Sequence, residues 1–392
     1  MVEYNPYAYE TQEDPYPIYK RLRDEAPVYR NDEIGFWALS RHADVLAALR
    51  DAELFSNRNG VSLDPSSWHP DANATMSFLA MDPPRHTRMR ALISRGFTPR
   101  RVSNLEARIR EITTEHIDGF IARGECDFIK DFAGKVPMDV ISEMIGVPVE
   151  DRDMLRTWAD LVVHREDGMM DVPPAGMQAA AQILNYFQEL IDEREQQPRD
   201  DLTGALLAAE IDGDRLMPRE ILGFLFLMVI AGNETTTKLL GNALYWISRN
   251  PGERQKVTDD PSLIPRWVEE TLRFDGSSQA LARTVTRDIE LHGEKLQEGD
   301  RLVVLLGSTN RDERVWEDPD RYDIMRNTTP MLSFGYGTHF CVGAALARLE
   351  GRIGLEELMK RFPDFELDSE KLIRVHSVNV RGFASMPIEF SG

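Results

Sequence analysis

Cysteine is scarce in this chain. Only Cys126 and Cys341 occur among 392 residues, so no framework of disulfide bonds holds the fold together. This composition is typical of a protein from a reducing compartment. The hydrophobic fraction of 42% and the charged fraction of 29% are those of an ordinary globular protein, and they leave ample apolar material for a core.

Long hydrophobic runs are also lacking. The most apolar segment, residues 221–231, is about eleven residues long, whereas a helix that crosses a bilayer needs roughly 20. It therefore predicts a buried helix. The N-terminal segment has neither the basic nor the apolar region of a signal peptide. We expect a soluble, cytoplasmic protein with no membrane anchor.

Positive charge is in deficit, with 46 basic against 66 acidic residues and a net charge of −20. Nucleic acids and anionic membranes both bind basic faces, so neither is expected as the main partner. A local basic patch for a small acidic protein remains compatible with this balance. No Gly-x-Gly-x-x-Gly motif follows a predicted strand, so the chain has no recognisable flavin or nicotinamide site.

Helical periodicity dominates the middle of the chain. Apolar residues recur at three- and four-residue spacing in segments 102–121, 137–145, 151–164 and 177–195. A long helix is predicted from about Pro218 to Ser248, on the order of 45 Å at 1.5 Å per residue. A last helix is predicted from just after Cys341 to about Arg361. The absence of repeats and long linkers favours one domain over residues 1–392.

Strand patterns are confined to two portions of the chain. A small hairpin is predicted near residues 25–40, with strands at 27–30 and 35–39 around a polar turn. Strands are also expected at 284–291 and 301–306, within a β-rich portion at 283–306. The pattern as a whole predicts a mainly α fold with a minor β region.

The surroundings of Cys341 favour a reactive thiolate. Gly335, Gly337 and Gly343 flank it, and glycine permits positive φ angles and close backbone approach. A helix-forming run follows, and a cysteine at a helix N-terminus gains support for its thiolate. A lone cysteine is more often a packed apolar residue, which is our interpretation of Cys126. A zinc site is disfavoured, because no second cysteine is near.

Two other patterns place polar residues on predicted helices. Glu234 and Thr235 lie midway along the long apolar helix, where the simplest interpretation is threonine hydroxyls bonded to carbonyls one turn earlier. Glu270 and Arg273, at i,i+3 spacing, can pair on one helix face. A surface pair of this kind contributes little to stability, so neither pattern by itself indicates a function.

Taken together, these residues resemble the cytochrome P-450 family. The segment Phe334-x-x-Gly337-x-His339-x-Cys341-x-Gly343 is similar to the haem-binding signature of that family, and the other patterns follow in the expected order over essentially the whole chain. The resemblance implies a P-450 fold that binds haem b between the long central helix and the helix after the cysteine loop. It also implies Cys341 as the axial iron ligand.

The resemblance further implies roles for individual residues. Gly232 would open the backbone over the haem, Thr235 would orient dioxygen, and Glu234 would supply protons. Glu270 and Arg273 would form a buried network that locks the cysteine loop. The remaining implied positions are Arg321 as third member of that network, Phe334 as a structural residue, His86, Arg90, Arg283 and His339 at the haem propionates, and Ala231 and Gly343 as further haem contacts.

The implied activity is that of a haem-thiolate monooxygenase. Such an enzyme would insert one atom of dioxygen into a lipophilic small molecule by hydroxylation or epoxidation, as a monomer. Electrons would come from a separate ferredoxin and its reductase. Candidate docking residues for the ferredoxin are Arg88, Arg95, Arg100, Arg101 and Arg348. The alternatives are a haem-thiolate peroxygenase or isomerase, and a non-catalytic haem sensor; the intact Glu234–Thr235 pair argues against all of these.

The substrate pocket is expected over the distal haem face. By position it would be formed by residues 60–79, 158–177, 227–231, 278–282 and 378–383. These segments are mostly apolar, as suits a hydrophobic ligand with few polar anchors. The apolar residues singled out are Met169, Met170, Leu227, Ile230, Leu281 and Phe383, and the candidate anchors are Ser277, Ser278, Gln279 and Asn379.

Overall fold

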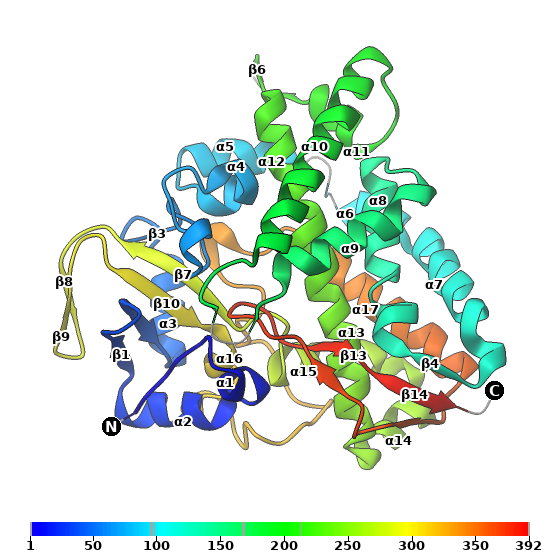
Figure 1. The fold of residues 1–392 in the computed structure, drawn as a ribbon. Coiled ribbons are helices and arrows are strands. Elements are labelled where there is room, and N and C mark those ends of the chain that lie inside the picture. Colours follow the sequence, from blue (N-terminus) through cyan, green and yellow to red (C-terminus); the bar gives the residue numbers. More distant parts are fainter. Residues whose placement is uncertain (1, 95–96, 98, 167–168, 212, 391–392) are drawn as a thin grey trace.

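A computed structural model describes residues 2–94, 97, 99–166, 169–211 and 213–390. Figure 1 shows a largely helical molecule whose strands lie mainly along one side and the base. The α-helices are α1 (Tyr9–Glu13), α2 (Tyr16–Glu25), α3 (His42–Arg50), α4 (Asn73–Met76), α5 (Arg85–Ile93), α6 (Pro99–Asn104), α7 (Glu106–Phe120), α8 (Val136–Ile145), α9 (Arg152–Val163), α10 (Pro174–Gln196), α11 (Leu202–Leu207), α12 (Pro218–Leu227), α13 (Asn233–Ser248), α14 (Pro251–Asp259), α15 (Ile264–Phe274), α16 (Leu306–Thr309) and α17 (Ala344–Arg361). Two π-helical turns, η4 (Ile129–Ala133) and η6 (Met228–Gly232), and the 3-10 turn η8 (Gly337–His339) bear on the site.

The strands form one five-stranded sheet and several small ones. They are β1 (Val28–Asn31), β2 (Phe36–Leu39), β3 (Phe55–Ser56), β4 (Glu125–Asp127), β5 (Glu210–Ile211), β6 (Asp214–Arg215), β7 (Ala280–Val285), β8 (Ile289–Leu291), β9 (Glu294–Leu296), β10 (Arg301–Leu305), β11 (Phe365–Leu367), β12 (Ile373–Arg374), β13 (Phe383–Ser385) and β14 (Pro387–Phe390). The larger sheet has the order β1-β2-β10-β7-β3, in which only the β2–β10 pairing is parallel.

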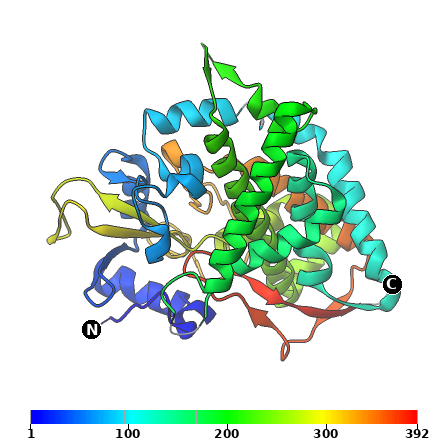
Figure 2. The same ribbon diagram turned by 45° about the horizontal axis from the view of Figure 1, so that its top comes forward.

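The long central helix spans the predicted range but is not uniform. It begins at Pro218, a first-turn position where proline is tolerated, and ends at Ser248. Between α12 and α13 it passes through the π-helical turn η6. Such turns carry i→i+5 hydrogen bonds and often mark functional sites. In Figures 1 and 2 this green central run separates the blue and yellow strands from helices α7 and α8.

The predicted hairpin near residues 25–40 is confirmed as β1 and β2, and the mainly α class is confirmed. The single strand predicted at 284–291 is wrong. β7 starts earlier, at Ala280, and ends at Val285 before β8 begins at Ile289. Asp288 holds the bend between them, because its Oδ1 accepts a hydrogen bond of 2.9 Å from the Glu298 N–H. Alternation of residue types does not reveal such a bend.

The helix predicted at 102–121 is split into α6 and α7. The Leu105 N–H donates to the Val102 carbonyl, which ends α6 with a tighter i→i+3 bond. The predicted last helix is confirmed as α17, which ends at Arg361. Among the described residues, no helix combines the length and the apolar character needed to span a membrane.

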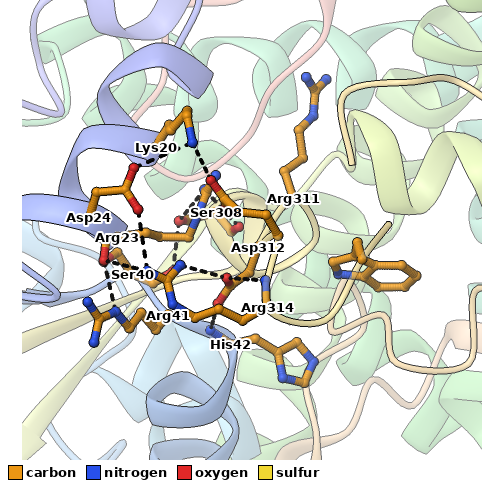
Figure 3. A network of polar contacts seen from close by, with 12 residues as sticks. Lys20, Arg23, Asp24, Ser40, Arg41, His42, Ser308, Arg311, Asp312 and Arg314 are labelled. Carbon is orange, nitrogen blue, oxygen red and sulfur yellow. Dashed lines mark hydrogen bonds and ion pairs between the residues drawn. The ribbon is translucent and has the colours of Figure 1, made fainter. Parts of the chain in front are cut away.

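A polar network fastens the N-terminal helices to the segment that follows α16 (Figure 3). The buried Arg23 side chain donates to the Ser308 carbonyl and hydroxyl at 3.2 and 3.1 Å. At the start of α3, the His42 N–H donates to Asp312 at 2.8 Å. Buried groups of this kind require partners, and here the partners are supplied by segments about 270 or more residues away in sequence.

Candidate active site

The candidate site is an apolar pocket between the central helix and the N-terminal part of α17. The lining residues from the central helix are Leu227, Met228, Ala231, Gly232, Thr235, Thr236 and Leu239, and those from the cysteine loop and α17 are Phe334, Gly335, His339, Phe340, Cys341, Val342, Gly343, Leu346, Ala347 and Glu350. Both groups were expected to enclose a flat cofactor.

Glycine fixes the shape of the cysteine loop at two positions. Gly335 and Gly337 have φ angles of +69° and +67°, which L side chains rarely adopt. A Cβ at Gly337 would also lie 2.9 Å from the Leu49 carbonyl oxygen. Gly343 differs, because its φ is −85° and its Cα faces the Cys341 sulfur. The Cys341 N–H closes the loop by donating to the Phe334 carbonyl at 2.9 Å.

The Cys341 thiol faces the pocket just before α17. The backbone N–H groups of Gly343 and Ala344 donate toward its sulfur, and Arg90 and Arg348 add positive potential. Burial outweighs these effects and raises the pKa of Cys341. A cation must therefore replace the proton before the sulfur becomes a thiolate in this apolar surrounding. The iron of a haem is such a cation.

Four cationic or polar side chains crowd one edge of the pocket without an acidic partner. The rings of His86 and His339 are 4.2 Å apart, and no nitrogen of either ring has a hydrogen-bond partner within the described chain. Burial lowers the pKa of His86 to about 4, with Arg90 contributing. Burial, followed by the charge of Arg283, lowers that of His339. Buried donors of this kind require an anion, and the two propionates of a haem fit that requirement.

Removing one of these cations should weaken haem retention. Arg283 is 3% exposed, and its pKa is lowered to about 10, chiefly by burial. We expect Arg283→Gln to lose haem roughly tenfold faster, because one good charge-assisted contact contributes about 1.5–3 kcal/mol. Transfer of haem to apomyoglobin measures the rate. The exposed Arg287→Gln, on the same side of β7, should match the wild type, and equal rates for both variants would contradict the assignment.

The distal face of the pocket carries Thr235. Its hydroxyl donates to the Ala231 carbonyl one turn earlier, at 2.8 Å, as in the simplest interpretation of the sequence. The Ser277 hydroxyl donates to the Thr235 carbonyl at 2.7 Å. Gly232 lines the pocket but has an ordinary helical φ of −79°. A Cβ there would lie 2.3 Å from Ile141 Cδ1, so packing against α8 requires glycine, and the backbone opening falls to the π-helical turn η6.

Glu234 turns away from the pocket that Thr235 lines. It is 2% exposed, and its Oε2 lies 3.0 Å from Lys238 Nζ, one turn later on α13. Both side chains are almost fully buried. The two members of the predicted acid–alcohol pair therefore face different surroundings in this structure.

Glu350 is a pocket residue that the motifs did not reveal. It is buried on α17, hydrogen-bonds Thr236, and keeps its Oε1 without a partner within the described chain. Burial raises its pKa to about 8. The available signal was its spacing: Leu346, Glu350 and Ile353 share the buried face of α17, and an acid on an apolar face is unusual.

The buried Glu350 carboxyl should make stability pH-dependent. Its folded pKa of about 8 exceeds the unfolded value of about 4.3, so its contribution is complete below pH 4.3 and is lost as the pH rises through 8. We expect Glu350→Gln to gain stability over the wild type across that window, by at most about 1.4 kcal/mol per pH unit. Urea unfolding between pH 5 and about 8 measures the difference. A pH-independent difference would show that Glu350 is ionised throughout.

The Glu270–Arg273 pair is buried and holds the approach to the cysteine loop. Arg273 donates to both oxygens of Glu270, at 2.7 and 2.8 Å, and to the carbonyls of Asn310 and Pro319 at 2.9 Å each. Asn310 in turn accepts from the Leu332 N–H and donates to the Ser333 hydroxyl. This chain of hydrogen bonds ends one residue before Phe334.

The prediction that the Arg321 side chain completes this network is wrong. That side chain is 64% exposed and pairs with Asp323, and only the Arg321 carbonyl accepts from Arg273, at 3.2 Å. The third cation is Arg326, whose Nε lies 3.5 Å from Glu270 Oε1 and whose side chain is 10% exposed. The main chain between the two arginines turns back toward α15, so the later arginine reaches the pair.

The expected substrate-lining segments are only partly brought to the pocket. Of the residues singled out, Leu227, Leu281, Ser277 and Ser278 line it, whereas Ile230, Met169, Met170, Gln279, Asn379 and Phe383 do not. Phe383 is 1% exposed within a separate core. Lining residues that had not been singled out include Phe78, Leu79, Phe97 and Phe224.

The predicted docking arginines differ in their availability. Arg88 is engaged by Asp214 and Glu220, so it offers no free charge and its assignment is wrong. Arg348 pairs with Glu269 and lies 4.5 Å above the Phe334 ring. Arg100 is exposed. Arg95 and the side chain of Arg101 lie outside the described residues.

Comparison with known proteins agrees with this geometry. The family model "Cytochrome P450" matches residues 34–384. The putative cytochrome P450 123 of Mycobacterium tuberculosis is 56% identical over 385 residues, covering 98% of this chain and 96% of the relative. The structure of CYP109Q5 from Chondromyces apiculatus superposes with a TM-score of 0.89 at 36% identity, over 100% of this chain and 98% of that chain. CYP109E1 from Bacillus megaterium in complex with testosterone gives 0.85 at 32% identity, over 97% and 100%. The chain therefore belongs to the cytochrome P450 family, and it is a monooxygenase that binds haem.

Proposed function

We propose that this monooxygenase hydroxylates or epoxidises a bulky lipophilic molecule, such as a steroid or terpenoid. The observation that carries the proposal is the pocket lining above Cys341, in which aromatic and aliphatic side chains predominate. Ser277 and Ser278 are its main uncharged polar groups on the strand side. The likeness to CYP109E1, whose structure contains testosterone, supports a ligand of that size.

The residues of this chain have separate tasks in the proposed reaction. Haem, when bound, supplies dioxygen activation. The apolar wall of Phe78, Leu227 and Leu281 binds the substrate and excludes water from it. The Thr235 hydroxyl, now bonded to Ala231, rotates to donate into the pocket. Glu234 is the proposed source of the proton that passes toward Thr235.

Ligand titration followed by turnover tests this function. Testosterone, a diterpene, palmitate and a polar amino acid are added separately to the haem-loaded enzyme while the Soret band is observed. We expect the polycyclic ligands to shift the band to shorter wavelength and to yield oxygenated products with one dioxygen consumed per product. A shift with palmitate alone would redirect the proposal to fatty acids. Turnover with peroxide but not with electron donors would identify a peroxygenase instead.

We also propose a separate ferredoxin as the electron donor. The support is local: Arg100 and Arg348 are charged residues near the cysteine-loop side, on a molecule of net charge −20. Arg100→Glu should lower ferredoxin-driven turnover about tenfold at low salt, because steering depends on complementary charge. Arg199→Glu, an exposed arginine after α10, is the control. Equal turnover for both variants would place the docking face elsewhere.

A further inference from the structure

The buried acid Glu234 has a second partner, which comes from a different helix. Its Oε2 is held by Lys238, while its Oε1 has no hydrogen-bond donor within the described residues. The carboxyl of Asp160, on α9, approaches Glu234 at hydrogen-bonding range. Helix α9 packs across the π-helical turn η6, immediately before Glu234. Two carboxyl groups therefore meet where α9 crosses the central helix.

Two carboxyl groups can hydrogen-bond only if one of them carries a proton, because a carboxylate is solely an acceptor. Burial of the Asp160 carboxyl raises its pKa, and the negative charge of Glu234 raises it further. Lys238 on α13 and Arg156 on α9 act in the opposite direction. Arg156 is shared with Asp153, which it contacts at 3.0 Å. A proton on Asp160 would satisfy the otherwise unpartnered Glu234 Oε1.

Asp160 also connects this buried acid with solvent. The residue is exposed on the outer face of α9, although its carboxyl is turned inward among protein atoms. Glu234 is 2% exposed and does not line the pocket. Asp160 is thus the member of the pair that can exchange protons with water.

We propose that Asp160 and Glu234 share one proton, and that Asp160 is a positioning residue which reloads Glu234 from solvent. The proposal rests on the proposed function, in which Glu234 supplies protons to the Thr235 side. When Glu234 rotates inward and gives up its proton, its carboxylate takes the proton of Asp160. The Asp160 carboxylate then takes one from water. No electrons are transferred, and each turnover proton is replaced by one solvent proton.

The test compares Asp160→Asn, Asp160→Glu and Asp192→Asn in the haem-loaded enzyme. Asparagine can still donate to Glu234 Oε1 but cannot release a proton. Asp192, an exposed carboxylate on α10 bonded to Gln188, is the matched control. We expect Asp160→Asn to lower product formation roughly tenfold or more, with a larger solvent deuterium effect and unchanged substrate affinity. Asp160→Glu should restore most of the rate, and Asp192→Asn should leave it unchanged.

A second measurement does not depend on turnover. At neutral pH the infrared spectrum of the wild type should contain a protonated-carboxyl band that shifts in deuterium oxide and disappears in Asp160→Asn. A band retained in Asp160→Asn, or a solvent isotope effect identical to that of the wild type, would overturn the inference. If the wild type forms no oxygenated product but the band behaves as expected, the proposed function fails while the shared proton remains.

Discussion

Replacing Cys341 by serine is expected to abolish both the long-wavelength carbon monoxide band of the reduced enzyme and its turnover. The sulfur lies in the pocket with two backbone N–H groups directed at it, and no second cysteine approaches it among the described residues. A serine oxygen cannot supply the electron donation of a thiolate. The glycine-shaped loop is unaffected by the change, so the variant should still fold. Difference spectroscopy with carbon monoxide measures the band directly.

Cys126→Ser is the control for that experiment. Cys126 lies in β4 and is 7% exposed, and burial raises the pKa of its thiol to about 12. It is therefore an inert packed group. We expect its serine variant to keep the band and the turnover, with a loss of stability of about 1–2 kcal/mol from a buried hydroxyl. A normal band in Cys341→Ser would refute the ligand assignment.

Replacing Glu270 by glutamine is expected to destabilise the protein by roughly 3–5 kcal/mol, because one half of a buried ion pair is left uncompensated. Both side chains of the pair are fully buried, and Arg273 would lose its acidic partner while remaining charged. The loss should extend to the cysteine loop through Asn310 and Ser333. We therefore expect faster haem loss as well as a lower urea midpoint.

The matched comparison for Glu270→Gln uses the two nearby arginines. Arg326→Gln should be clearly destabilising, because its guanidinium faces Glu270 from a largely buried position. Arg321→Gln should leave the urea midpoint close to that of the wild type, because its side chain is exposed. The reverse order of the two arginine variants would contradict the network described above. Equal m-values would show that the unfolded states are comparable.

The cysteine loop was predictable because its information is local. A run of ten residues contains the glycines that require positive φ, the ligand and the start of α17, so spacing alone places them together. The same holds for Glu270 and Arg273, which lie one helical turn apart. The choice between Arg321 and Arg326 could not be made in this way. Both lie in the irregular segment between α16 and η8, where no periodicity states which side chain turns inward.

The partners of the central acid were beyond prediction for a different reason. Lys238 was within reach, since it follows Glu234 at i,i+4 on a predicted helix. Asp160 is about 70 residues earlier in the sequence, and its approach depends on how α9 crosses the central helix. The π-helical turn at that crossing has no known residue signature. Glu350 was detectable, by contrast, from its place on the apolar face of α17.

The way Arg273 holds the segment between α16 and the cysteine loop bears on how this protein can evolve. Three of its contacts are to the carbonyls of Asn310, Pro319 and Arg321, which any amino acid would supply. The side chains at those last two positions are thus free to drift without loosening the anchor. Natural diversity can accumulate along this stretch, while Glu270 and Arg273 themselves admit almost no replacement.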